Sequence, residues 1–104
     1  SGVVICAGTI LTCDIVVSEH VHLNLATTVG HDCQLKPFVT TAPAVNISGA
    51  CDIGELTYIG TNVALREGLR IAAGTTIGMG AVVVTHIVDP GVYVGNPAKK
   101  LPQK

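Results

Sequence analysis

The sequence has little of what normally covers the surface of a small monomeric domain. Only 12% of its 104 residues are charged, 3% are aromatic and tryptophan is absent. The formal net charge of −1 argues against nucleic acid or an anionic membrane as a partner. No apolar run approaches the ~18 residues of a membrane span, and no signal peptide opens the chain. Because 48% of the residues are apolar, we expect part of the apolar surface to meet another subunit.

The chain also lacks a CxxC pair, the usual mark of a redox or zinc motif, although it contains four cysteines. Cys33 and Cys51 occupy a small inward position of the repeat described below, where a thiol acts as a small apolar group. Cys6 and Cys13 fall at other positions of the repeat. We therefore expect four free thiols in a reducing cytoplasm.

A six-residue repeat is the strongest signal that is present, and it continues unbroken from residue 5 to residue 88. Its first positions are aliphatic except at Thr41, and the fifth position of each hexad is small, β-branched or aliphatic. Charged residues avoid both positions. A helix of ~3.6 residues per turn does not follow this spacing. The first positions are Ile5, Leu11, Val17, Leu23, Val29, Leu35, Thr41, Ile47, Ile53, Ile59, Leu65, Ile71, Ile77 and Val83.

So short a period predicts an all-β solenoid in which the first and fifth residues of each hexad point inward. Glycine at the second position, as at Gly30, is expected to ease the bends. Three hexads make a coil of 18 residues, so the 14 hexads give a little under five coils. Residues one coil apart then stack at the strand spacing of ~4.8 Å. We expect the Thr41 hydroxyl to bond to backbone.

The two ends of the chain depart from the repeat. Residues 1–88 form the predicted β-helix, and residues 89–104 form a C-terminal turn, a short extended segment and a tail. The turn is signalled by Asp89-Pro90-Gly91. Nothing in the sequence covers the first coil, whose edge would expose unpaired backbone groups. A preceding domain or a packing partner is expected there.

The hexads ending in GVYVGNPAKKL resemble the hexapeptide-repeat acyltransferases, which are left-handed parallel β-helices that work as trimers. The segment LNLATTVGHDC is similar to a bacterial branch that includes sialic acid O-acetyltransferases and bacillosamine and perosamine N-acetyltransferases. The resemblance covers essentially the whole chain. It implies a left-handed, single-stranded parallel β-helix, a homotrimer, acetyl-CoA as co-substrate without a metal, and a small-molecule sugar acceptor. Relatives also carry an N-terminal domain for the nucleotide sugar, which this sequence does not contain.

The resemblance assigns the catalytic roles to His31 as general base and Asp32 as the acid that orients it. An imidazole titrating near neutrality suits the removal of a proton from a hydroxyl or amine that attacks a thioester. Asn24 would hold the acceptor or the ring. Gly49, one coil on, is expected to leave open space beside the imidazole. Without the resemblance, the simpler interpretation is that His31 is a solvent-facing residue at a bend.

The coenzyme contacts of the family map to Gly49, Thr61 and Arg70. Relatives carry a second histidine, nine residues after the base, that contacts the acetyl region, and here that position is Thr40. A hydroxyl there can still donate a hydrogen bond. His22 is expected to stack one coil from Thr40. The simpler interpretation is a plain surface histidine, and the alternative is a substitute for the family histidine.

Three other functions remain open at this point. A γ-type carbonic anhydrase uses the same solenoid but needs three histidines around a metal, and the HxxxxH pair of that class is missing here. A non-catalytic solenoid that has lost its acceptor-binding domain would be recognised by a lack of acetyl-CoA affinity. A nucleophilic Cys13 stacked beside His31 is the least economical, because direct transfer needs no thiol.

Overall fold

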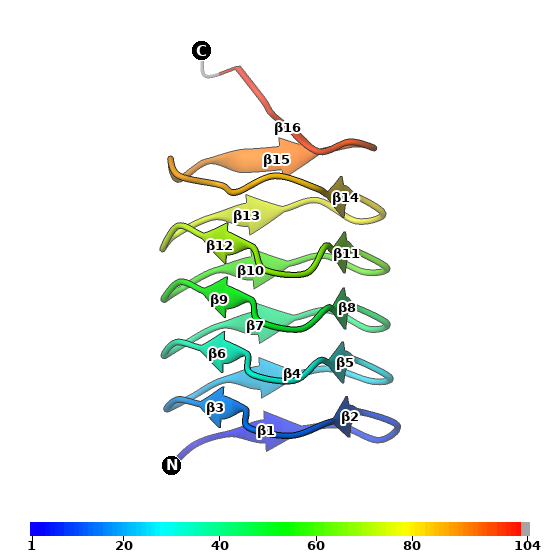
Figure 1. The fold of residues 1–104 in the computed structure, drawn as a ribbon, viewed down its shortest axis with the longest axis vertical. Helices are drawn as coiled ribbons and strands as arrows, with labels where there is room; N and C mark the ends of the chain where they lie inside the picture. The colour runs from blue at the N-terminus through cyan, green and yellow to red at the C-terminus, as the bar shows by residue number, and fades with distance from the viewer. Residues whose placement is uncertain (103–104) are drawn as a thin grey trace.

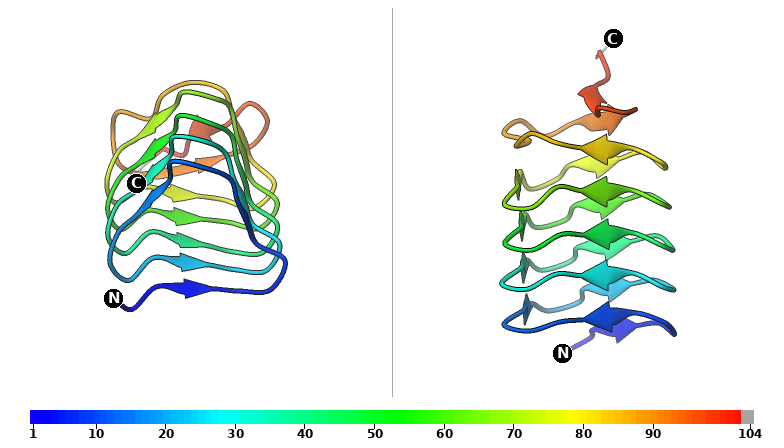
Figure 2. Two further views of the ribbon diagram at one scale, coloured as in Figure 1. Left: turned by 60° about the horizontal axis from the view of Figure 1, so that its bottom comes forward. Right: turned by 45° about the vertical axis from the view of Figure 1, so that its right-hand side comes forward.

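The structure, a computed structural model, describes residues 1–102 and consists in that range of short strands and turns. The strands recur every six residues, and successive coils stack from the N-terminal to the C-terminal end (Figure 1). Viewed toward one end of the stack, each coil has three sides (Figure 2). This is the predicted left-handed parallel β-helix of about five coils. No helix in the described residues is long and apolar enough to cross a membrane.

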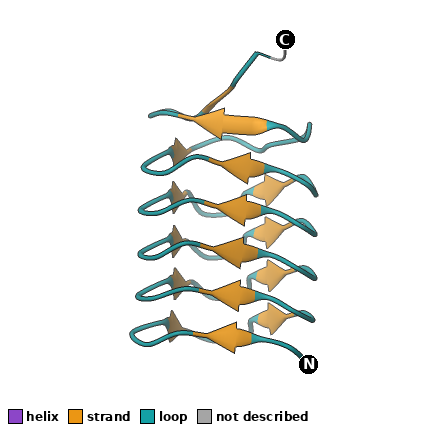
Figure 3. Ribbon diagram, turned by 180° about the vertical axis from the view of Figure 1, so that it is seen from behind, coloured by secondary structure: helices purple, strands orange, loops and turns teal. Residues whose placement is uncertain are grey.

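The strands form three sheets, one on each side of the coil (Figure 3). The first sheet contains β1 (Val4–Ile5), β4 (His22–Leu23), β7 (Thr40–Thr41), β10 (Tyr58–Ile59), β13 (Thr76–Ile77), β15 (Val92–Val94) and β16 (Lys99–Lys100). The second contains β2 (Ile10–Leu11), β5 (Thr28–Val29), β8 (Asn46–Ile47), β11 (Ala64–Leu65) and β14 (Val82–Val83). The third contains β3 (Val16–Val17), β6 (Gln34–Leu35), β9 (Asp52–Ile53) and β12 (Arg70–Ile71). Partners such as His22 and Thr40 lie one 18-residue coil apart, which confirms the predicted coil length.

The two inward positions of the hexad fill the interior, as predicted. First-position residues from Leu23 to Val83 and fifth-position residues from Val21 to Ala81 are each at most 3% exposed. Thr41, the one polar residue at a first position, also has a hydrogen-bond partner. The Thr41 hydroxyl accepts a hydrogen bond from the backbone N–H of Asn24 at 3.1 Å, which confirms the expected bond to backbone.

The bends lie later in the hexad than predicted. The third and fourth residues form the turn, and the fourth adopts the left-handed conformation, as at Phe38 with φ of 64°. The second-position glycines have a different role. A Cβ at Gly30 would lie 2.5 Å from the backbone N of Gly49 on the next coil. Glycine at the second position therefore permits a close approach of successive backbones.

The last coil is shorter than the others, so the expected unbroken spacing to residue 88 is wrong there. Ile87 pairs with Ile71, 16 residues earlier rather than 18. Strand β15 then returns to the first sheet, and β16 pairs with it in antiparallel orientation. The end of the predicted tail, residues 103–104, lies outside the described residues.

The first coil exposes apolar side chains in this structure. Ile5, which occupies an inward position of the repeat, is 47% exposed, and Ile10 is 59% exposed. Their equivalents one coil on, Leu23 and Thr28, are respectively buried and half-buried. The interior of the solenoid is thus complete from the second coil onward, where the candidate site begins.

All four cysteines are free thiols. Cys33 and Cys51 are buried in the core, and their thiols donate to the carbonyl oxygens of Ser48 and Arg66, each at 3.2 Å. Burial raises the pKa of both the Cys33 and the Cys51 thiol. Both residues therefore act as small core residues, as the repeat predicted.

Candidate active site

The turn that carries His31 and Asp32 follows β5, where the chain passes from the second sheet to the third. Asp32 is the left-handed residue of this turn, with φ of 58°, a conformation that aspartate tolerates better than most residues. Its N–H donates to the carbonyl oxygen of Cys13 on the preceding coil at 3.1 Å. The carbonyl oxygen of His31 accepts from the N–H of Ala50 on the following coil at 2.7 Å. The turn is therefore held from both neighbouring coils.

The side chains of this turn form a hydrogen-bonded pair. Nδ1 of His31 lies 3.0 Å from Oδ2 of Asp32, and the two side chains are 54% and 62% exposed. An exposed pair of this kind stabilises the fold little. Its chemical effect is clearer, because a carboxylate at Nδ1 favours the tautomer with the proton on that nitrogen. Nε2 then keeps its lone pair and can accept a proton, which is the arrangement of a general base.

The imidazole covers Gly49 on the next coil. A Cβ at Gly49 would lie 2.6 Å from Nε2 and 2.8 Å from Cε1 of His31. The open space that we expect beside the ring at Gly49 is therefore occupied by the ring itself. The predicted stacking of Cys13 on the other side of this turn is confirmed by the hydrogen bond from Asp32.

Asn24 lies at a different corner of the coil. It follows β4 and precedes the turn from the first sheet to the second, whereas His31 lies one corner further on, after β5. The carboxamide oxygen of Asn24 accepts a hydrogen bond from the N–H of Leu25 at 2.8 Å. One chain therefore does not bring Asn24 to His31.

The residues expected to contact the coenzyme are spread over the coil. Thr40 lies on β7 in the first sheet, where it pairs with His22 as expected. Thr61 lies in the turn after β10, and Arg70 lies on β12 in the third sheet. Gly49, in the turn after β8, is the member of this set that lies against His31. A single chain does not gather them around one point.

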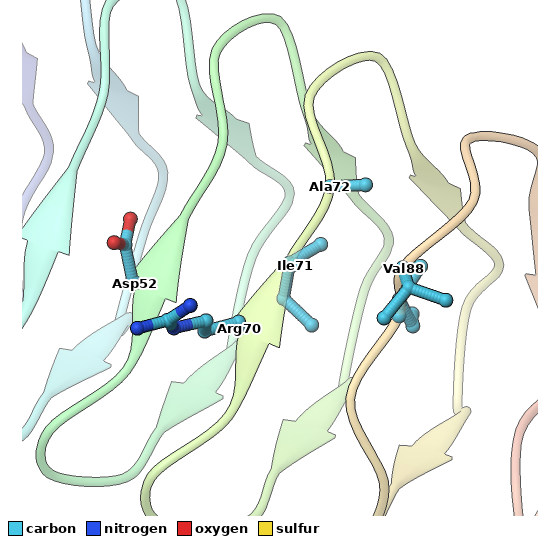
Figure 4. A pocket seen from close by; sticks show the side chains of 6 residues that line it. Asp52, Arg70, Ile71, Ala72 and Val88 are labelled. Atoms are coloured by element: carbon cyan, nitrogen blue, oxygen red, sulfur yellow. The ribbon is translucent and has the colours of Figure 1, made fainter.

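A pocket of about 300 Å³ lies on the third side of the solenoid, toward its C-terminal end (Figure 4). Its charged members are Asp52 and Arg70, which are paired in register on β9 and β12. The remaining lining residues are apolar: Ile71, Ala72, Ile87 and Val88. Next to it, the backbone N–H of Arg70 donates to Nδ1 of His86 at 3.0 Å. Sequence reasoning identified Arg70 but missed the pocket, because the shortened last coil places Ile87 and Val88 out of the predicted register.

Within residues 1–102, no group of three or more histidine, cysteine, aspartate or glutamate side chains is placed to hold a metal ion. The four histidines lie at different points of the coil: His20 and His31 in two different turns, His22 on β4 and His86 in the last coil. His20, for example, stacks on Phe38 with ring centroids 5.0 Å apart, and His22 lies 3.7 Å from the Cys6 sulfur through Nε2.

No family model matches the chain, but individual proteins do. GDP-perosamine N-acetyltransferase of Escherichia coli O157:H7 is 36% identical over 106 residues, covering 97% of this chain and 48% of that protein. WeeI from Acinetobacter baumannii is 34% identical with a TM-score of 0.89, over 95% of this chain and 52% of the other. The acetyltransferase domain of PglB from Neisseria gonorrhoeae, solved with acetyl coenzyme A, is 38% identical with a TM-score of 0.78, over 96% and 52%. The chain thus spans about half the length of these relatives.

Proposed function

We propose that this chain, which belongs to the hexapeptide-repeat sugar acetyltransferases, moves an acetyl group from acetyl-CoA to a nucleotide sugar. The acceptor is an amino or hydroxyl group of that sugar. The observation that carries this proposal is the His31–Asp32 pair, with 3.0 Å between Nδ1 and Oδ2 on a turn that faces solvent. One relative is named for N-acetylation of a nucleotide-linked amino sugar and another was solved with acetyl coenzyme A. These names favour an amino group as the acceptor.

The proposed mechanism assigns one proton transfer to His31. Acetyl-CoA supplies the acetyl group as an activated thioester. As the amino or hydroxyl group of the acceptor attacks the thioester carbonyl, Nε2 of His31 removes its proton. Asp32 holds the ring through Nδ1 and balances the positive charge of the imidazolium that forms. The ring becomes neutral again by releasing the proton as the thiol leaves.

Arg70 is the residue best placed to attract the coenzyme phosphates. A guanidinium binds phosphate oxygens through several donors at once, and the apolar residues Ile87 and Val88 line the same pocket. We assign the phosphates of the coenzyme to Arg70 and its long uncharged arm to the apolar wall, with Asp52 beside Arg70 at the same pocket. In the same proposal Thr61 contacts the coenzyme, and the Thr40 hydroxyl donates to the acetyl region in place of the family histidine. Gly49 lies against the His31 ring, so this proposal places it beside the base and not at the coenzyme.

We propose that the active form is a homotrimer, which we expect sedimentation velocity to show as a species of three times the 10.6 kDa chain mass. Asn24 and Thr40 lie beside and on the first sheet, whereas Arg70 lies on the third, so one chain cannot present all three to one ligand. Two neighbouring solenoids can, because the corner of one then faces a side of the other. A monomer that turns over acetyl-CoA would contradict this assembly.

Replacing Asp32 with asparagine tests its role in the pair. The fold should be retained, since asparagine also tolerates the left-handed conformation of this position. We expect turnover to fall roughly 10- to 100-fold, less than for loss of the base itself, because a neutral carboxamide does not balance the imidazolium. Steady-state kinetics with calorimetric titration of acetyl-CoA checks this. Equal losses in affinity and turnover would instead assign Asp32 to coenzyme binding.

The cysteines support a cytoplasmic location for the proposed enzyme. All four are free, including the exposed Cys13. Free thiols persist in reducing compartments. Thiol labelling of the protein in intact cells would test this location.

A non-catalytic β-solenoid is the second candidate. It is favoured by Thr40, which stands where the family resemblance leads us to expect a second histidine. Calorimetric titration with acetyl-CoA distinguishes the two candidates. The enzyme proposal predicts saturable binding that is weakened when Arg70 is replaced by alanine. A chain that binds no acetyl-CoA and turns over no acceptor would be a structural or binding solenoid.

A further inference from the structure

We infer that Gly49 is a positioning residue for His31, because its missing side chain provides the place in which the imidazole lies. The inference rests on the proposed role of His31 as general base. A Cβ at Gly49 would lie 2.6 Å from Nε2, 2.8 Å from Cε1 and 2.9 Å from Cδ2 of His31. The three distances are nearly equal, so the added Cβ would lie over the ring near Nε2. The imidazole therefore has a carboxylate at Nδ1 and the bare backbone of Gly49 against it near Nε2.

Gly49 is not required by the backbone conformation of its own turn. Its φ lies outside the left-handed region, and the left-handed residue of this turn is Ala50, with φ of 58°. Alanine is therefore compatible with the backbone at position 49. The glycine is needed for space and not for conformational freedom.

Gly30, immediately before His31, strengthens this interpretation. Its N–H donates to the carbonyl oxygen of Ile47 at 2.7 Å, and a Cβ at Gly30 would lie 2.8 Å from the carbonyl carbon of Ser48. Because Gly30 has no side chain, the His31 turn can lie close to the backbone of the next coil, where the imidazole contacts Gly49. The third-position residues one coil before His31 and one coil after Gly49, Cys13 and Glu67, both carry side chains.

A methyl group at position 49 must therefore displace the imidazole. Ordinary van der Waals contact begins at 3.4 Å, whereas the nearest ring atom would be at 2.6 Å. Relief of this clash moves the ring away from Gly49 and alters its hydrogen bond to Asp32. A displacement on the order of 1 Å in a catalytic group costs about 10²-fold in rate.

The test is Gly49→Ala in the full chain. We expect kcat to fall about 10²-fold, with the melting temperature and the KM for acetyl-CoA unchanged. Ala7→Ser is the matched control: it adds one atom at an exposed third position on another corner of the coil and should keep wild-type turnover. In a His31→Ala background, Gly49→Ala should cause no further loss, because the ring that it displaces is gone.

A spectroscopic measurement separates this inference from the proposed function. Nitrogen-15 NMR of the imidazole is expected to show the Nδ1–H tautomer in the wild type and changed ring signals in Gly49→Ala. If the wild type turns over no acceptor, the proposed function fails while the NMR comparison still decides the role of Gly49. Unchanged His31 signals would overturn the inference. So would a raised KM at constant kcat, or an equal loss in the His31→Ala background, since either would assign Gly49 to the coenzyme.

Discussion

His31→Ala is expected to lower acetyl transfer by roughly 10²–10⁴-fold, the contribution of a general base, while assembly and acetyl-CoA binding persist. The side chain of His31 is 54% exposed and lies outside the inward series, so its removal leaves no cavity in the core. The backbone of its turn remains bonded to Cys13 and Ala50 on the neighbouring coils. Thiol release from acetyl-CoA measures turnover, and calorimetry measures affinity.

The matched control is His20→Ala. His20 lies at another corner of the coil and stacks on Phe38 with ring centroids 5.0 Å apart. Among the described residues, no carboxylate is paired with the His20 ring. This variant should retain wild-type turnover. Full activity in His31→Ala, or an equal loss in both variants, would remove His31 from the role of base.

Val63→Asp is expected to abolish folding. Val63 is fully buried at the fifth position of its hexad, so the substitution places a carboxylate in the core without a partner. An unpaired buried charge costs several kcal/mol, and the whole stability of a domain is about 5–15 kcal/mol. Circular dichroism should show loss of the β signal and of the cooperative thermal transition.

Glu55→Lys provides the control for this substitution. Glu55 lies at an exposed third position in a turn, so reversal of its charge should leave the melting temperature unchanged within the small effects of surface substitutions. A well-folded Val63→Asp protein would contradict the inward register of the repeat. Unfolding of Glu55→Lys would also contradict this register, because it would show that the third position does not face solvent.

The interior of the fold was predictable because it depends on one repeated rule. Apolar residues at the first and fifth positions are buried from the second coil onward, and the 18-residue stacking follows from three hexads per coil. The turn position was less predictable. Phe38 and Leu56 adopt left-handed conformations that their intrinsic preferences disfavour, so local propensity pointed to the glycines instead. The shortened last coil was hidden because Ile87 fits an inward position in either spacing.

The candidate site was also predictable only in part from the sequence. His31 and Asp32 are adjacent in sequence, so their pairing on a turn followed from the repeat and the resemblance. The stacking of Gly49 on His31 followed from the spacing, but the ring orientation that fills the space depends on side-chain packing. Arg70 lies on a different side of the coil from Asn24 and Thr40, and the sequence of one chain carries no direct signal of how several chains would combine them.

The most direct test of the proposed function is acceptor-dependent thiol release from acetyl-CoA by the wild-type protein. A panel of amino- and hydroxy-sugar nucleotides should be supplied with and without an N-terminal nucleotide-sugar-binding domain from a relative. We predict release with at least one amino-sugar nucleotide, an acetylated product by mass spectrometry, and near-complete loss in His31→Ala. Failure to bind acetyl-CoA, together with no release from any acceptor, would contradict the acetyltransferase function and leave a non-catalytic solenoid.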